Sequence, residues 1–196
     1  MKALRLPFFF LLAIGLLAWS GCSDDDDDLI IETLNYDGDN FTAPNLDANI
    51  FAAYFPPSEL QNVTDRNLES VAFFLEAVPP EVEVIVYAAG ATDREPGAEL
   101  YRSPSLLNRV NATGEFITHR LRTPIDLSQQ NDGIWLAIQT DIAPGNRVQS
   151  VGCDAGNNYN PNGDRIRIGN TWTSFNEVTG SEQVNWNIRG ILSSVN

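Results

Sequence analysis

The sequence predicts an all-β domain, a single antiparallel β-sandwich of jelly-roll type over residues 35–196, behind a short N-terminal leader. Three observations predict this fold class. The apolar segments are short and alternate with polar residues, turn-forming pairs separate them, and almost no stretch has a helical period. We expect about eight strands arranged in two sheets. A closed barrel is the alternative, because alternation alone does not separate the two architectures.

The strands are expected at 49–55, 68–75, 82–87, 116–121, 134–139, 165–168 and 184–189. The turn-forming pairs between them are Pro56-Pro57, Pro79-Pro80, Pro96-Gly97, Asp132-Gly133, Pro144-Gly145 and Asn162-Gly163. One helical turn is expected at 57–61, with Ser58 as its cap. The spacing along the remainder is typical of an all-β domain.

The first 21 residues are expected to be a signal peptide that is not part of the fold. Lys2 and Arg5 precede an apolar run at 6–19, which is short for a membrane span and typical of a signal sequence. Cys22 follows two small residues, and this stretch resembles a bacterial lipobox, although Trp19 stands where that pattern prefers an aliphatic residue. The resemblance implies that Cys22 is lipidated and anchors the protein to a membrane. Ordinary secretion with cleavage near Ser20 is the alternative.

An acidic tether is expected at 22–34. Five consecutive aspartates at 24–28 repel one another and stay solvated. A short acidic run directly after the cysteine resembles the lipoprotein export signal of Bacteroidota, which implies lipid anchoring in the outer membrane with exposure at the cell surface. A spacer without an address, or retention at the inner membrane, remains open.

The charge balance excludes one class of partner. The chain has 12 Lys and Arg residues against 26 Asp and Glu residues, for a formal net charge of −14. Nucleic-acid binding requires a basic face, so we expect no nucleic acid as a partner. Two cysteines and one histidine are too few for a zinc site built from Cys and His.

Several motifs in the C-terminal half resemble a β-sandwich domain of secreted and surface proteins of Bacteroidota. They are Gly133-Ile-Trp-Leu-Ala-Ile138, Val151-Gly-Cys-Asp-Ala-Gly156, Asn162-Gly-Asp164, Trp172-Thr-Ser-Phe175 and Asn185-Trp-Asn-Ile-Arg-Gly190, preceded by Phe55-Pro-Pro-Ser-Glu-Leu60. Asn157 stands where that family has a proline. The family is similar to the adhesin modules of gingipain-type proteins, so the resemblance implies a jelly-roll fold and a role in adhesion or carbohydrate contact.

The polar loop 154–164 offers two candidate sites. Asp154, Asn162 and Asp164 are oxygen donors of the kind that bind Ca²⁺, although the loop has no closing bidentate Glu. Tyr159 in this loop and Trp172, expected in a loop nearby in the sequence, are with Asn158 and Asn160 the residue types of a carbohydrate platform. The alternatives are Asx turns that satisfy their own backbone, and a Trp172 that caps the core. Trp135 and Trp186 are expected in the core.

No residue is expected to be catalytic. Cys153 is expected to be a small buried hydrophobe, and His119, on one strand face between Ile117 and Leu121, a packed and hydrogen-bonded histidine. We therefore expect a non-catalytic cell-surface module that binds a glycan or a host or matrix protein and needs no cofactor. A structural or accessory envelope lipoprotein that binds another protein is the alternative, and a hydrolase ranks below both.

Overall fold

A computed structural model describes residues 32–38, 41–110, 112–155 and 158–193 of the chain. The expected signal peptide, Cys22 and the aspartates at 24–28 lie outside the described residues. Strand β1 (Thr33–Leu34) pairs with the C-terminal strand of the fold, and Leu34 is buried. The described fold therefore begins inside the segment expected to be tether.

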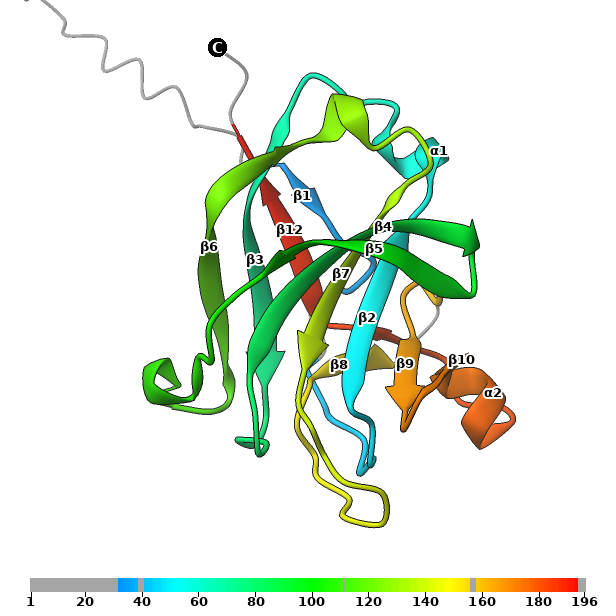
Figure 1. Cartoon of the computed structure of the whole chain (residues 1–196). Coiled ribbons are helices and arrows are strands. Elements are labelled where there is room, and N and C mark those ends of the chain that lie inside the picture. Colours follow the sequence, from blue (N-terminus) through cyan, green and yellow to red (C-terminus); the bar gives the residue numbers. More distant parts are fainter. Residues whose placement is uncertain (1–31, 39–40, 111, 156–157, 194–196) are drawn as a thin grey trace, which may run out of the picture.

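Two antiparallel sheets make up most of the domain (Figure 1). The first has the order β1, β12 (Ile188–Leu192), β3 (Asn67–Leu75) and β6 (Glu115–Asp126). The second has the order β10 (Thr171–Ser174), β9 (Arg165–Ile168), β2 (Ile50–Phe55), β7 (Ile134–Gln139), β4 (Glu83–Thr92) and β5 (Glu95–Arg102). A third, small sheet pairs β11 (Val184–Trp186) with β8 (Cys153–Ala155). The all-β prediction is confirmed.

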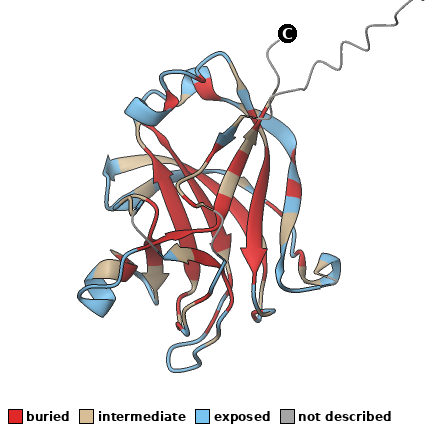
Figure 2. Ribbon diagram, turned by 180° about the vertical axis from the view of Figure 1, so that it is seen from behind, coloured by how far each residue is buried: buried red, intermediate tan, exposed pale blue. Residues whose placement is uncertain are grey.

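The main core lies between the two large sheets, and strand alternation fills it. In β2, Phe51, Ala53 and Phe55 join the main core, whereas Ile50, Ala52 and Tyr54 join a second cluster on the other face of the sheet. Figure 2 shows buried residues concentrated on the strands and exposed residues on the loops. Trp186 is 1% exposed in the main core, and its indole nitrogen donates to the carbonyl of Arg165 at 2.9 Å. The prediction that Trp186 is a core residue is confirmed.

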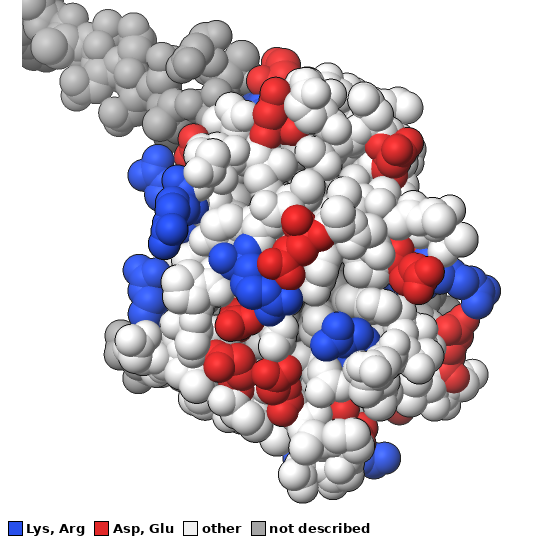
Figure 3. All heavy atoms as spheres, in the orientation of Figure 1, with Lys and Arg blue, Asp and Glu red and all other residues white. Residues whose placement is uncertain are grey.

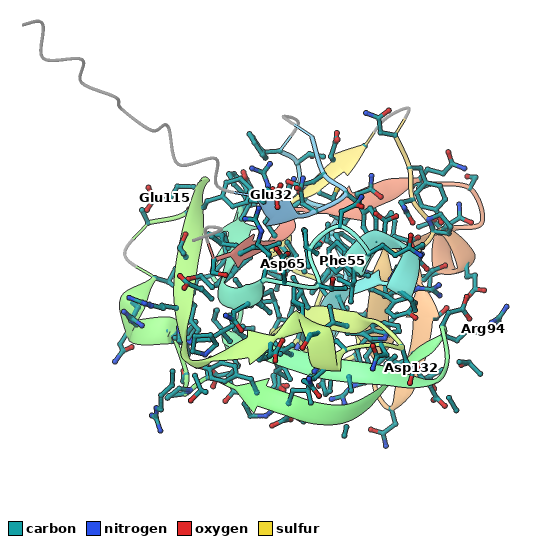
Figure 4. All side chains as sticks on the ribbon, turned by 90° about the horizontal axis from the view of Figure 1, so that it is seen from above. Glu32, Phe55, Asp65, Arg94, Glu115 and Asp132 are labelled. Carbon is teal, nitrogen blue, oxygen red and sulfur yellow. The ribbon has the colours of Figure 1, made fainter. Side chains whose placement is uncertain are left out.

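The second cluster explains why both faces of the central strands are apolar. It combines Tyr54, Ile85, Tyr87 and Trp135 with smaller residues, and Trp172 packs against it. Beyond Ala88, β4 no longer pairs with β7, so the rest of the β4–β5 hairpin is an arm that projects from the sheet. Arg94 lies at the arm's tip (Figure 4). Its guanidinium is 3.9 Å from the carboxylate of Glu177, in the short segment that follows β10. Trp135 is fully buried, as predicted, but in this second cluster.

The segment expected as one last strand, 184–189, is divided between two sheets. Val184–Trp186 pairs with β8, and Ile188–Leu192 pairs with β3. The division at Asn187 is fixed by a buried polar group: the Asp37 carboxylate accepts from the Asn187 amide at 3.0 Å and forms an ion pair with Arg189 at 2.7 Å. An alternating sequence does not reveal a sheet change, because both halves keep the same period.

The described residues contain four short helical segments. They are α1 (Pro57–Leu60), η1 (Leu107–Arg109), η2 (Leu127–Gln129) and α2 (Phe175–Thr179), and of these only α1 was predicted. Ser174 caps α2 by accepting from the Glu177 amide, and Gly180 ends it in the left-handed region. Ser58 is not a cap, because α1 already begins at Pro57. Among the described residues, no helix has the length and apolar character needed to cross a membrane.

The buried Asp37 makes a test of this core possible. Replacing Arg189 by Met should lower the free energy of unfolding by about 3 kcal/mol, because the fully buried Asp37 carboxylate would lose its cationic partner. Urea denaturation measures the change. Arg147, an exposed arginine with no ion pair among the described residues, provides the control Arg147→Met, which should cost about 0.5 kcal/mol or less. Equal losses for the two variants would contradict this role of Arg189.

Candidate binding site

The polar loop expected to bind a ligand is occupied by its own hydrogen bonds. Asp154 accepts from the amide of Gly38 at 2.8 Å. The Oδ2 atom of Asp164 accepts from the amide of Asn176 at 3.0 Å and from the hydroxyl of Tyr159 at 3.3 Å. Burial raises the pKa of Asp164 above its ordinary value. The two carboxylates therefore serve different elements of the fold.

The asparagines of this loop also form hydrogen bonds within the protein. The Asn160 side chain accepts from the amide of Asn162, which is an Asx turn, and the Asn162 side chain accepts from Arg165. Asn185 of β11 accepts from the Asn160 amide and donates to the carbonyl of Asn158. Within the described ranges, no three Asp, Glu, His or Cys side chains gather as a metal site would require. Asp154, Asn162 and Asp164, the residues proposed for Ca²⁺, each accept a hydrogen bond from a different segment of the fold.

Trp172 and Tyr159 have different surroundings. Trp172 lies in strand β10, not in the expected loop, and its ring centroid is 5.6 Å from that of Trp135 and 6.4 Å from that of Tyr87. Tyr159 contacts Asp164 instead, and burial with the neighbouring carboxylate raises its pKa to about 12. Within the part of the chain that is described, the rings of Tyr159 and Trp172 make no contact with each other.

A groove that the sequence did not indicate runs between β5 and β6. Within the described ranges, β5 pairs only with β4 and β6 pairs only with β3, so the two strands form neighbouring open edges of the sandwich (Figure 1). One hollow of about 560 Å³ is lined by Tyr101, Pro104, Arg122 and Pro124, among others. Two further hollows of about 380 Å³ each continue from it, and they share the lining residues Leu106, Arg109 and His119. We call these three hollows together the edge groove.

The edge groove is basic in a strongly acidic protein. Its lining residues include Arg102, Arg109, Arg120 and Arg122 and no Asp or Glu. Arg102 is neutralised, because it forms ion pairs with Glu83 and Glu99. Arg109, Arg120 and Arg122 are exposed and form no ion pair with any described residue. Figure 3 shows basic side chains gathered at the edge of the molecule that carries β6.

A histidine and a tyrosine join the two edge strands within the groove. The hydroxyl of Tyr101 in β5 lies 2.7 Å from Nε2 of His119 in β6. His119 is 6% exposed, and its Nδ1 atom has no hydrogen-bond partner among the described residues. Burial and the nearby Arg109 guanidinium lower the pKa of His119. The prediction of a packed, hydrogen-bonded histidine is confirmed. The Nδ1 atom of His119 is a polar group without a hydrogen-bond partner among the described residues.

The groove residues escaped detection because a sequence does not show which strand edges meet. Arg120 and Arg122 alternate with the buried His119 and Leu121, which is the pattern of any strand with one wet face. Arg109 lies in η1 and is not part of this alternating pattern. It reaches Arg120 and Arg122 only in the folded structure. The usable signal was the local absence of acid: no Asp or Glu occurs between Glu99 and Glu115, or between Glu115 and Asp126.

Cys153 has the properties of a structural residue. Its side chain is 2% exposed, and burial, reinforced by Asp154 and Glu182, raises the pKa of the thiol to about 12. The thiol therefore stays protonated at neutral pH. The prediction of a buried, hydrophobic Cys153 is confirmed.

Thiol labelling tests this assignment. A chain that begins at Ser23 contains Cys153 as its single cysteine. The folded chain should react with an aromatic disulfide reagent at least ~100-fold more slowly than the urea-unfolded chain, because the buried, protonated thiol is not a nucleophile. Reaction of the folded and unfolded chains at similar rates would place Cys153 in a reactive environment and contradict the assignment.

The lowered pKa of His119 predicts that the stability of the fold depends on pH. Because its pKa in the folded protein lies below its ordinary value of 6.5, the unfolded chain binds the proton more tightly. The stability associated with neutral His119 is therefore present above pH 6.5 and is lost as the pH falls through the folded pKa. Proton NMR of this single histidine should show a titration midpoint below 6.5, and His119→Gln should remove the corresponding slope in urea denaturation. A midpoint above 6.5 would contradict the burial effect.

Comparisons with known proteins find little similarity. No family model matches the chain, and no curated protein matches it. A solved structure of the cysteine protease and lectin-like domains of Cwp84, a surface layer associated protein of Clostridium difficile, is similar to this chain with 17% sequence identity and a TM-score of 0.41. The similarity covers 75% of this chain and 33% of that chain, so this chain spans about a third of the other's length.

Proposed function

We propose that this protein is a non-catalytic binding module of the cell surface, held to the outer membrane by a lipid on Cys22, and that it binds a glycan chain in the edge groove. The observation that carries the proposal is the groove itself. It is open, runs between two strand edges, and contains one buried polar atom, Nδ1 of His119, that has no hydrogen-bond partner among the described residues. Buried or constrained polar groups without partners are uncommon in a protein that has no use for them.

The groove also has the chemistry that glycan binding needs. Tyr101 contributes an aromatic ring, and Thr118, Thr123, Ser105 and Asn108 contribute hydroxyl and amide groups from the lining. Ligand sites combine apolar surface with a few fixed polar groups in this way. The lipid anchor and the acidic tether, expected from residues 22–28, would hold such a groove away from the membrane surface.

Among the described residues, Cys153 and His119 do not form a nucleophile–base pair, which supports a binding role. The thiol of Cys153 is buried and protonated, and the histidine His119 is held by Tyr101, in another strand of the groove. Nucleophilic catalysis requires a base within hydrogen-bond reach of an activated nucleophile. Among the described residues these two side chains lie in separate sheets, β8 and β6.

A groove-filling variant tests the proposed function. Thr118 lines the groove and is exposed, so Thr118→Trp should fill the groove without disturbing the core. On a glycan array, the chain from Ser23 onward should bind at least one glycan class, and Thr118→Trp should weaken that binding by about tenfold or more through steric exclusion.

Thr171→Trp is the matched control, because Thr171 is an exposed strand threonine in β10, at the opposite edge of the six-stranded sheet from β5. This control variant should bind as the unmodified chain does. An array with no bound glycan, together with capture of a defined protein partner, would favour the accessory-lipoprotein alternative. Glycan binding that Thr118→Trp leaves intact would place the site elsewhere.

A further inference from the structure

We propose that the edge groove selects anionic polysaccharides, whose carboxylate or sulfate groups are bound by Arg109, Arg120 and Arg122. This inference rests on the proposed function and names the ligand class of the same site. It is carried by the arrangement of charge in the groove, which is independent of the groove's shape.

The sign of the groove charge is the first argument. Charged residues on exposed edge strands protect a sheet from pairing with another chain, so some charge at β6 is expected in any sandwich. A chain with 26 acidic and 12 basic residues would supply that protection with acidic residues if sign were unimportant. Instead the groove collects three exposed arginines and no lining acid. The lining of the groove is therefore basic in a chain whose charged residues are mostly acidic.

These arginines are available to a ligand. Several other arginines are paired with acids: Arg66 with Glu32, Arg102 with Glu83 and Glu99, and Arg189 with Asp37. Arg109, Arg120 and Arg122 keep their guanidinium groups exposed and without an acidic partner among the described residues. A guanidinium presents paired donors that match the oxygens of a carboxylate or a sulfate.

The spacing of the arginines favours a polymer with repeated charges. Arg120 and Arg122 are two residues apart on β6 and project from the same face, about 7 Å apart along the strand. Arg109 approaches the same hollow from η1 beside His119, so the charges extend across the groove. A linear chain that carries an anionic group at intervals can engage several of these sites at once, which raises its affinity above that of a single anion.

The edges themselves disfavour an acidic peptide as the ligand. A peptide that binds an open edge adds a strand through main-chain hydrogen bonds. Pro124 interrupts the exposed edge of β6, and Pro96 lies in β5, with Pro104 shortly after it. Because proline lacks an N–H group, it removes the donors that strand addition requires. A ligand that contacts side chains rather than the main chain fits these edges better.

Binding of defined polymers tests the inference. The probes are polygalacturonate, dextran sulfate and neutral dextran, added to the chain from Ser23 onward, which retains every described residue. Both anionic polymers, or one of them, should bind, and the affinity should fall about tenfold or more between about 50 mM and about 500 mM salt because exposed charges are screened. Neutral dextran should not bind.

Charge variants locate the effect. Arg120→Gln with Arg122→Gln should weaken binding of the anionic polymer about tenfold, because two charge-assisted contacts are lost. Arg147→Gln makes a similar charge change at an exposed loop outside the groove lining and should leave the affinity within about twofold. Equal weakening by the groove pair and by Arg147→Gln, corrected for the number of charges removed, would indicate general attraction and overturn the inference.

The single histidine gives a readout that separates the two proposals. His119 faces Arg109 from η1 and Tyr101 from β5, and Arg120 follows it on β6, with no acid in the groove lining. An anion bound in the groove should raise the pKa of His119, because it stabilises the protonated ring, whereas a neutral glycan should not. Groove-dependent binding of a neutral glycan, insensitive to salt, would overturn the anionic selectivity and leave the proposed function standing. Absence of any groove-dependent glycan binding would overturn both.

Discussion

The open edge between β5 and β6 is the structural constraint on which the proposed binding site depends. The chain leaves β5 in one sheet, passes through η1, and enters β6 in the other sheet. The passage is anchored by Ser103, whose amide and hydroxyl both bond to Val84, and by Leu106, whose amide bonds to the carbonyl of Val82 and whose side chain is buried. Two edges are therefore held beside one another without pairing, and their side chains face a shared groove.

An opposite arrangement holds at the other end of the fold. Around the loop that follows β8, the polar side chains are directed into the protein's own backbone, and the glycines permit the approach: a Cβ at Gly163 would lie 2.5 Å from the Asn185 side chain. Asn185 in turn holds the carbonyls of Tyr36 and Asn158. These hydrogen bonds tie the loop before β9 to β11 and to the backbone at Tyr36.

The sequence was sufficient for the class of fold because each core strand carries its own alternation. Strands β2 and β7 carry apolar residues on both faces. One face of each strand is buried in the main core, and the other face is buried in the second cluster. What the sequence could not show depends on contacts between distant segments. Strand β5 contains Pro96 and Gly97, a pair that predicts a turn. Proline is tolerated in this strand because β5 lies at the edge of its sheet.

The candidate site was harder to predict than the fold because it depends on contacts between segments that are distant in the sequence. Asn, Asp and Tyr concentrated in one loop are conspicuous, yet Asp164 and Tyr159 bond to each other and Asn160 turns back on its own chain. The arginines of the groove are spread over η1 and β6 and become a cluster only when two sheets bring their edges together. Composition shows how many charges a chain has, and topology decides which of them meet.

Backbone amide chemical-shift mapping with an anionic oligosaccharide locates the bound ligand without changing the protein. If the edge groove binds the oligosaccharide, the perturbed amides should lie in β5, in η1 and in β6, with the largest changes beside Arg109, His119 and Arg122. Perturbations confined to the loop around Tyr159, or to β10 around Trp172, would contradict binding in the edge groove and return the site to the residues that the sequence first indicated.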